Sequence, residues 1–157
     1  MLDISALQNL RGDFTASNDG EIKFNSGITS ISGCTITTDG VALDFANVTE
    51  LVNTNLYAQS GGVLTFGKLT TAAIDGDNNT TWQATGANSK IEFTALTTLN
   101  NTVTDSFSGH HYIQAESGGH IDLSQLTAVN RANNPLDTRW SATTINNIVT
   151  RNSRVRN

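Results

Sequence analysis

A chain of 157 residues is long enough to form one domain with a buried core. Its formal net charge of −5 argues against nucleic acid as the main partner, and no apolar run is long enough for membrane insertion. Charged residues make up only 15% of the chain, so Asn and Thr provide much of the polar surface. This composition is less typical of a cytosolic enzyme than of a protein outside the cell.

One pattern recurs six times along the chain. It consists of two apolar residues that flank any one residue, followed by two more apolar residues at steps of three. Its first apolar positions are 2, 22, 43, 64, 91 and 121, so the spacing is 20, 21 and 21 residues and then 27 and 30. Self-similarity at such a period is typical of a repeat protein. The second copy carries one inserted residue before Ile28.

Each copy also contains a tripeptide of the form apolar-x-small, and Gly-rich or Asn-rich turns separate the pieces. The six tripeptides are Phe14-Thr15-Ala16, Ile36-Thr37-Thr38, Leu56-Tyr57-Ala58, Trp82-Gln83-Ala84, Ile113-Gln114-Ala115 and Trp140-Ser141-Ala142. Every repeat therefore has three short pieces of strand character and no run long enough for an amphipathic helix.

These observations predict an all-β protein, a right-handed parallel β-helix with three faces and about six coils of about 21 residues over residues 1–142. Like residues of successive coils should then stack about 4.8 Å apart. The inward column is predicted to be Phe24, Phe45, Phe66, Phe93 and Leu123. Residues 143–157 are predicted to form a C-terminal cap or tail, because Ile145, Ile148 and Val149 suit one helical face.

The extra length of the later repeats is concentrated at 73–81, 100–112 and 130–139, which makes the loops of the C-terminal half longer. All three insertions should leave the same corner of successive coils, and insertions on one face of a repeat protein often bind ligands. The candidate ligand-contact residues are Asp75, Asp77, Asn78, His110, His111, Tyr112, Arg131 and Arg139.

Several motifs have both a functional and a structural interpretation. Arg11-Gly12-Asp13 spells a cell-binding tripeptide, but it also suits a tight corner. The turn at 75–79 has spaced oxygen ligands, yet it lacks the Gly and the final Glu of a calcium loop, so no metal is predicted there. His110 and His111, with Asp105 nearby, suggest either zinc or a pH-sensitive loop, and neighbouring histidines that point apart favour the second. We predict no cofactor.

The aromatic and acidic residues allow two further functions. Trp82 and Trp140 could stack on a sugar with the assistance of Tyr57 and Tyr112, but the inward positions of both Trp residues favour burial beneath the long loops. Of the aromatic residues, only Tyr57 is predicted to point outward within a strand. Glu92 and Asp122 should be outward neighbours at one coil spacing, which is too close for an inverting glycosidase and slightly close for a retaining one. The lone Cys34 cannot form an intrachain disulfide and is interpreted as a small corner residue.

The segments Gly61-Gly62-Val63-Leu64-Thr65-Phe66-Gly67-Lys68-Leu69-Thr70-Thr71 and Gly118-Gly119-His120-Ile121-Asp122-Leu123-Ser124-Gln125-Leu126-Thr127 resemble the β-helical repeats of large bacterial exported and adhesin-like proteins. The resemblance covers residues 2 to about 142. It implies an extracellular or bacterial cell-surface location within a longer protein. We predict that the chain functions as a non-catalytic structural and binding module. The alternative is a polysaccharide lyase or hydrolase. Expected partners are a glycan or a surface protein, and the chain could also self-associate through an open N-terminal coil.

Overall fold

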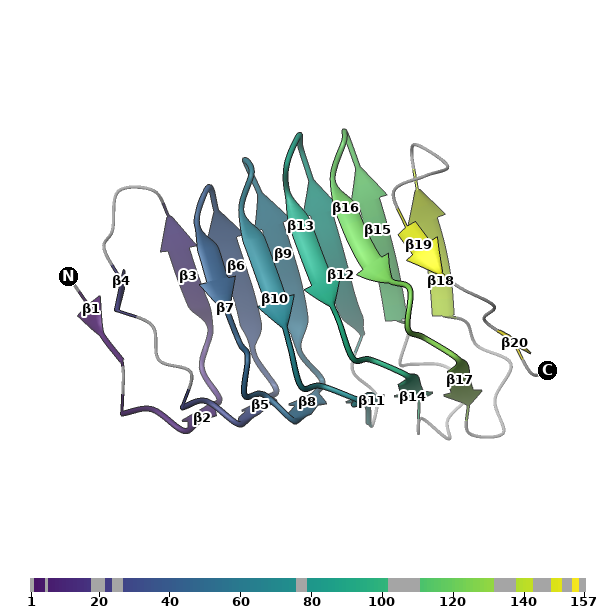
Figure 1. Cartoon of the computed structure of the whole chain (residues 1–157), viewed down its shortest axis with the longest axis horizontal. Coiled ribbons are helices and arrows are strands. Elements are labelled where there is room, and N and C mark those ends of the chain that lie inside the picture. Colours follow the sequence, from purple (N-terminus) through teal and green to yellow (C-terminus); the bar gives the residue numbers. More distant parts are fainter. Residues whose placement is uncertain are drawn as a thin grey trace.

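The computed structural model describes residues 2–4, 6–17, 22–23, 27–75, 79–101, 111–131, 138–142, 148–150 and 154–155. Every regular element in these ranges is a β-strand, which confirms the prediction of an all-β protein. The strands are short, and every pairing between them is parallel. In Figure 1 they follow one another along the long axis of the molecule, from the N-terminus to the C-terminus.

Every third strand of the chain joins the same sheet. A seven-stranded sheet contains, in this order, β2 (Asn9–Leu10), β5 (Ser30–Ser32), β8 (Glu50–Val52), β11 (Thr71–Ile74), β14 (Thr98–Asn101), β17 (Ala128–Arg131) and β20 (Arg154–Val155). A six-stranded sheet contains β3 (Phe14–Ser17), β6 (Thr35–Asp39), β9 (Asn55–Gln59), β12 (Thr80–Thr85), β15 (His111–Glu116) and β18 (Thr138–Ala142).

The third face is divided into two sheets. Five strands pair as β7 (Ala42–Asp44), β10 (Val63–Phe66), β13 (Lys90–Phe93), β16 (His120–Leu123) and β19 (Ile148–Thr150). β1 (Leu2–Asp3) and β4 (Ile22–Lys23) form a separate pair. In Figure 1 this face and the six-stranded sheet stand as two layers, and the seven-stranded sheet runs along the bottom. The chain thus folds as a parallel solenoid of three strands per turn.

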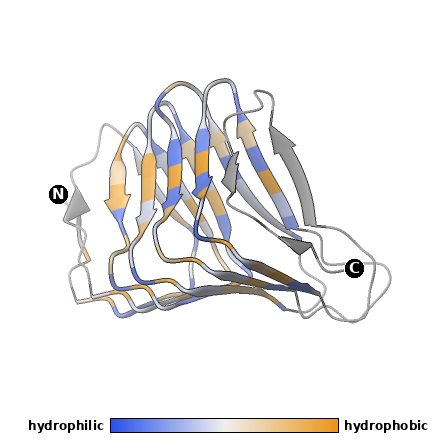
Figure 2. Ribbon diagram, turned by 45° about the vertical axis from the view of Figure 1, so that its right-hand side comes forward, coloured by the Kyte–Doolittle hydropathy of each residue, from blue (hydrophilic) through white to orange (hydrophobic). Residues whose placement is uncertain are grey.

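The register between neighbouring strands confirms the repeat that the sequence predicts. Leu64 pairs with Leu43 on one side and with Ile91 on the other, and Ile91 pairs with Ile121. Like residues therefore stack on like through successive coils. Figure 2 shows the result as hydrophobic bands that continue from strand to strand.

The core contains the predicted aromatic column. The ring centroids of Phe45 and Phe66 are 5.1 Å apart, those of Phe66 and Phe93 are 5.0 Å apart, and both pairs are stacked. Leu123 is fully buried, whereas Phe24 lies outside the described residues. Trp82 is buried as predicted, and its ring centroid lies 4.6 Å from that of Phe93. Burial in β12 and β15 alternates from residue to residue, as a strand with one inward face requires.

Two of the sequence predictions need correction. The strands extend into the predicted insertions, so the connections shrink to 75–79, 102–110 and 132–137. The helical face predicted for the C-terminal segment is wrong at Ile148 and Val149, because these residues lie in β19 and pair with Ile121 and Asp122. The same apolar spacing that suits a helix here continues the solenoid repeat. The domain boundary at residue 142 stays a prediction.

Candidate functional site

One corner of the solenoid joins the seven-stranded sheet to the six-stranded sheet, and we call it the long-loop corner. Its connections are short at first, at 11–13, 33–34 and 53–54, and they lengthen to 75–79, 102–110 and 132–137. The strand order therefore confirms that the insertions leave the same corner in successive coils. Parallel stacking of the coils therefore places the starting points of these connections in one row.

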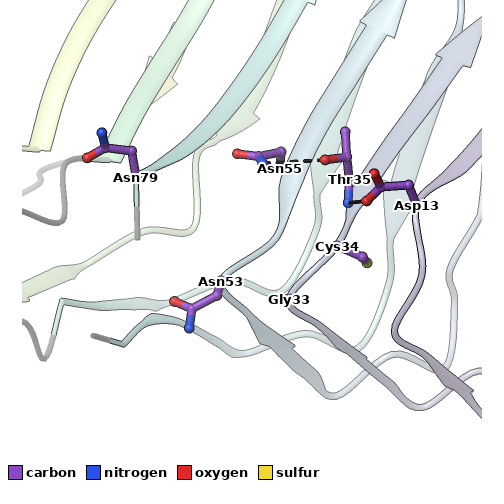
Figure 3. Close-up of a pocket in the computed structure, with 7 residues that line it drawn as sticks. All are labelled: Asp13, Gly33, Cys34, Thr35, Asn53, Asn55 and Asn79. Atoms are coloured by element: carbon purple, nitrogen blue, oxygen red, sulfur yellow. Dashed lines mark hydrogen bonds between the residues drawn. The ribbon is translucent and has the colours of Figure 1, made fainter. Parts of the chain in front are cut away.

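A hollow of about 310 Å³ opens in the short-connection part of this corner (Figure 3). Its lining is polar and comes from four successive connections and the strands that follow them. The lining residues are Asp13, Gly33, Cys34, Thr35, Asn53, Asn55 and Asn79. Of these, only Asp13 was a candidate in the sequence. The signal that could have found the hollow is the pair Asn53 and Asn55, one in a short connection and one at the start of β9.

Side chains of one coil bind the backbone of the next coil around the hollow. Asp13 Oδ1 accepts a hydrogen bond from the Thr35 backbone N–H at 2.8 Å, and Asn55 Oδ1 accepts one from the Thr81 N–H at 2.8 Å. Asn55 also donates to the Thr35 hydroxyl at 3.5 Å, so Asp13 and Asn55 hold Thr35 from two sides (Figure 3). These bonds keep the polar groups of the hollow in fixed positions.

The backbone turns sharply at the same corner position in two successive coils that line the hollow. Gly33 has a φ of 64° and Asn53 has a φ of 46°, both in the left-handed region that Gly and Asn tolerate best. The Asn53 carboxamide Oδ1 accepts a hydrogen bond from the Asp75 N–H at 2.7 Å. The short connection is thereby linked to the first long one.

The chemistry of the hollow does not suit a nucleophile. Burial raises the pKa of the Cys34 thiol, and the charge of Asp13 adds to the rise, while a hydrogen bond with Thr54 acts in the opposite direction. The thiol is therefore protonated at neutral pH and unreactive. This agrees with the interpretation of Cys34 as a small corner residue.

The tripeptide Arg11-Gly12-Asp13 is exposed at the first turn of the long-loop corner. The carboxylate of Asp13 has the structural role described above, because it binds the backbone of the next coil. The tight-corner interpretation therefore accounts for the Asp. A cell-binding role for the tripeptide stays a prediction.

His111 is not a loop residue, because it lies in β15 with its ring fully buried. It occupies the inward position that pairs with Thr80, whose hydroxyl lies 2.5 Å from Nδ1. The ring meets Trp82 edge-on, with centroids 4.4 Å apart. Desolvation lowers the pKa of His111 to about 3, so the ring is neutral. Contact between this ring and a ligand at the surface is excluded by its burial.

The other candidate residues of the long connections are described only in part. Tyr112 is half-buried on the outer face of β15, and Asp75 is exposed after β11. Asp77, Asn78 and His110 lie outside the described residues, and for Arg131 and Arg139 only the strand positions in β17 and β18 are described. In the described part of the chain, no three His, Cys, Asp or Glu side chains are grouped as metal ligands.

The outward carboxylates are neighbours, as predicted, but both have structural contacts. Glu92 pairs in register with Asp122. Lys90 Nζ lies 3.5 Å from Glu92 Oε1, and Asp122 Oδ1 accepts a hydrogen bond from the Ser124 N–H at 2.8 Å. A third carboxylate, Asp44, is separated from Glu92 by Thr65.

The strand order and the long-loop corner together define the class of this protein as a parallel, solenoid-like β protein with a polar corner hollow. No family model, curated protein or solved structure matches the chain. No helix in the described ranges is long and apolar enough to cross a membrane.

Proposed function

We propose that this chain is a non-catalytic structural and binding module of a bacterial surface or secreted protein, similar to the β-solenoids of adhesins. In this proposal it is a right-handed parallel β-helix of about six coils, and the right hand follows the strong preference of parallel crossover connections. The long-loop corner contacts a glycan or a surface protein. One observation carries the proposal: the polar hollow and all the lengthened connections share this corner.

The contacts of the reactive side chains favour binding over catalysis. Neighbouring coils are about 4.8 Å apart, whereas glycosidase carboxyl groups are about 5–5.5 Å apart in retaining enzymes and about 6.5–9.5 Å apart in inverting ones. Glu92 is close to Lys90, and Asp122 binds a backbone N–H. A polysaccharide lyase or hydrolase is the alternative that the experiment must test.

The test combines a glycan-array and pull-down screen with a lyase and hydrolase assay on the same 157-residue chain. We expect binding without turnover. Turnover of a polysaccharide that disappears in both Glu92→Gln and Asp122→Asn would contradict the proposal. A Thr65→Ala variant on the same outer face serves as the matched control for folding.

A further inference from the structure

An aromatic residue, Tyr57, lies in the same strand as one residue that lines the hollow. Tyr57 follows Asn55 by two residues in β9, so both side chains project from the same face of the sheet. Tyr57 is half-buried, and its register neighbours are Thr37 in the preceding coil and Gln83 in the next. Thr37 has a much shorter side chain than Tyr57. The earlier coils provide Asp13, Gly33 and Thr35 to the hollow.

The polar groups of the hollow are held in place and still have hydrogen-bonding capacity. Asn53 uses Oδ1 for the Asp75 N–H, and in the described ranges its Nδ2 has no hydrogen-bond acceptor. A carboxylate oxygen has further lone pairs beyond the one that Thr35 N–H engages at Asp13. The hollow thus offers amide, hydroxyl and carboxylate groups, and Tyr57 projects from the same sheet face as Asn55.

This combination matches the surface of a sugar ring. A pyranose carries donors and acceptors around its rim and apolar C–H groups on its faces. The rim can bind the amides, while the electron-poor C–H face packs on the electron-rich face of a Tyr ring. A hollow of about 310 Å³ is at the small end of the range for small-molecule sites, as a subsite for one or two sugar units requires.

The charges of the hollow select against ionic ligands. Among the described residues that line it, Asp13 is the single charged one, so this part of the lining offers no Lys or Arg to bind a phosphate, sulfate or uronate. A hard cation needs several convergent oxygen ligands, usually with more than one carboxylate. The lining is instead mostly neutral amide and hydroxyl.

We propose that the hollow and the Tyr57 ring form a subsite for a neutral sugar unit of an oligosaccharide. This inference rests on the proposed binding function and names its ligand class. The sugar rim would lie against Asn53 and Asn55, and one ring face would lie on Tyr57.

The solenoid itself supplies substitutions that its coils accept. Tyr57→Thr introduces the residue found at the paired position, Thr37, and Asn53→Gly introduces the residue found one coil earlier, Gly33, with a similar positive φ. Both remove ligand groups without changing the backbone. Gln125→Ala, at an exposed position on another corner, is the matched control.

The probe is an array of neutral and acidic oligosaccharides, followed by calorimetric titration of the strongest neutral binder. We expect each of the two variants to weaken that binding by about tenfold or more, with an unchanged thermal melt, and Gln125→Ala to have no effect. If the Asn53→Gly variant has a lower melting temperature than the unsubstituted chain, the Tyr57→Thr variant alone tests the inference. Unchanged affinity in a folded Tyr57→Thr variant, or no neutral binder on the array, would overturn the inference.

Two results would separate this inference from the proposed function. Binding only to acidic glycans or to a protein would refute the neutral-sugar subsite and leave the binding module standing. Turnover of a polysaccharide would refute the non-catalytic module itself.

Discussion

At the scale of single residues, the Phe column is the clearest determinant of stability. Phe66 is fully buried and stacks on Phe45 and Phe93 at about one coil spacing. We expect Phe66→Ala to lower the free energy of unfolding by about 3–5 kcal/mol, because it leaves a cavity between two stacked rings. Urea unfolding followed by circular dichroism measures the loss. Thr65→Ala, on the outer face, should cost much less, and equal losses would contradict the assigned inward register.

His111 should make stability depend on pH. Its ordinary pKa is 6.5 and its pKa in the folded chain is about 3, because burial disfavours the charged ring. Between these values the unfolded chain binds a proton that the folded chain does not. The free energy of unfolding therefore falls as pH is lowered through this window, by up to about 1.4 kcal/mol per pH unit, and its full value is retained above the window.

The upper part of this window isolates the His111 effect. Urea unfolding is measured between pH 6.5 and pH 5, where most carboxylates are still ionised. The slope of the unfolding free energy against pH in this range therefore reports histidine titration. His111→Gln keeps a hydrogen-bonding group near Thr80 and should flatten the slope. An identical slope in the variant would show that other groups cause the pH dependence.

At the scale of elements, the turn before β16 depends on a glycine for close approach. A Cβ added at Gly119 would lie 2.1 Å from the Ala84 carbonyl oxygen of the preceding coil, which no rotamer change can relieve. We expect Gly119→Ala to destabilise the fold by about 1–3 kcal/mol or more. Gly12→Ala is the matched control, since nothing lies within 4 Å of its added Cβ. Thermal melts that shift equally for both variants would contradict the close approach.

The connection at 102–110 should be dispensable for folding. The strands that flank it, β14 and β15, are each paired on both sides with neighbouring coils. Replacing 102–110 with the two-residue connection found at 53–54 shortens the loop, which lowers the entropic cost of closing it. We expect retained β-type circular dichroism and a cooperative melt. Loss of folding would show that this segment covers part of the core.

At the scale of the whole molecule, the edges of the sheets predict self-association. In the described part of the chain, β1, β2 and β3 each have a hydrogen-bonded neighbour on one side only. Unpaired backbone at a strand edge can add a strand from another chain. We expect the chain to form weak dimers in sedimentation velocity runs at rising concentration. Ala6→Lys with Gln8→Lys, at exposed positions of the first coil, should reduce them, and a strict monomer at all concentrations would refute the prediction.

Much of the fold could be predicted because the same apolar pattern recurs along the sequence. The positions of Leu43, Leu64, Ile91 and Ile121 indicate the register that the strands adopt, since stacked coils place like residues in line. Strand ends were less predictable. Ala73, Ile74, Thr80 and Thr81 pair with adjacent coils although their segment has the composition of a loop, because a neighbouring strand can extend pairing beyond any local preference.

The site depended on the three-dimensional arrangement. The sequence was sufficient to predict that the long connections share a corner, because parallel coils repeat their turns in the same place. The burial of His111 and the gathering of Asp13, Asn53, Asn55 and Asn79 around one hollow depend on contacts between coils. Asp13, Asn53 and Asn79 come from connections that are about one coil or more apart along the chain. Local periodicity determines which face of a strand is buried, but only stacking determines which corner side chains meet.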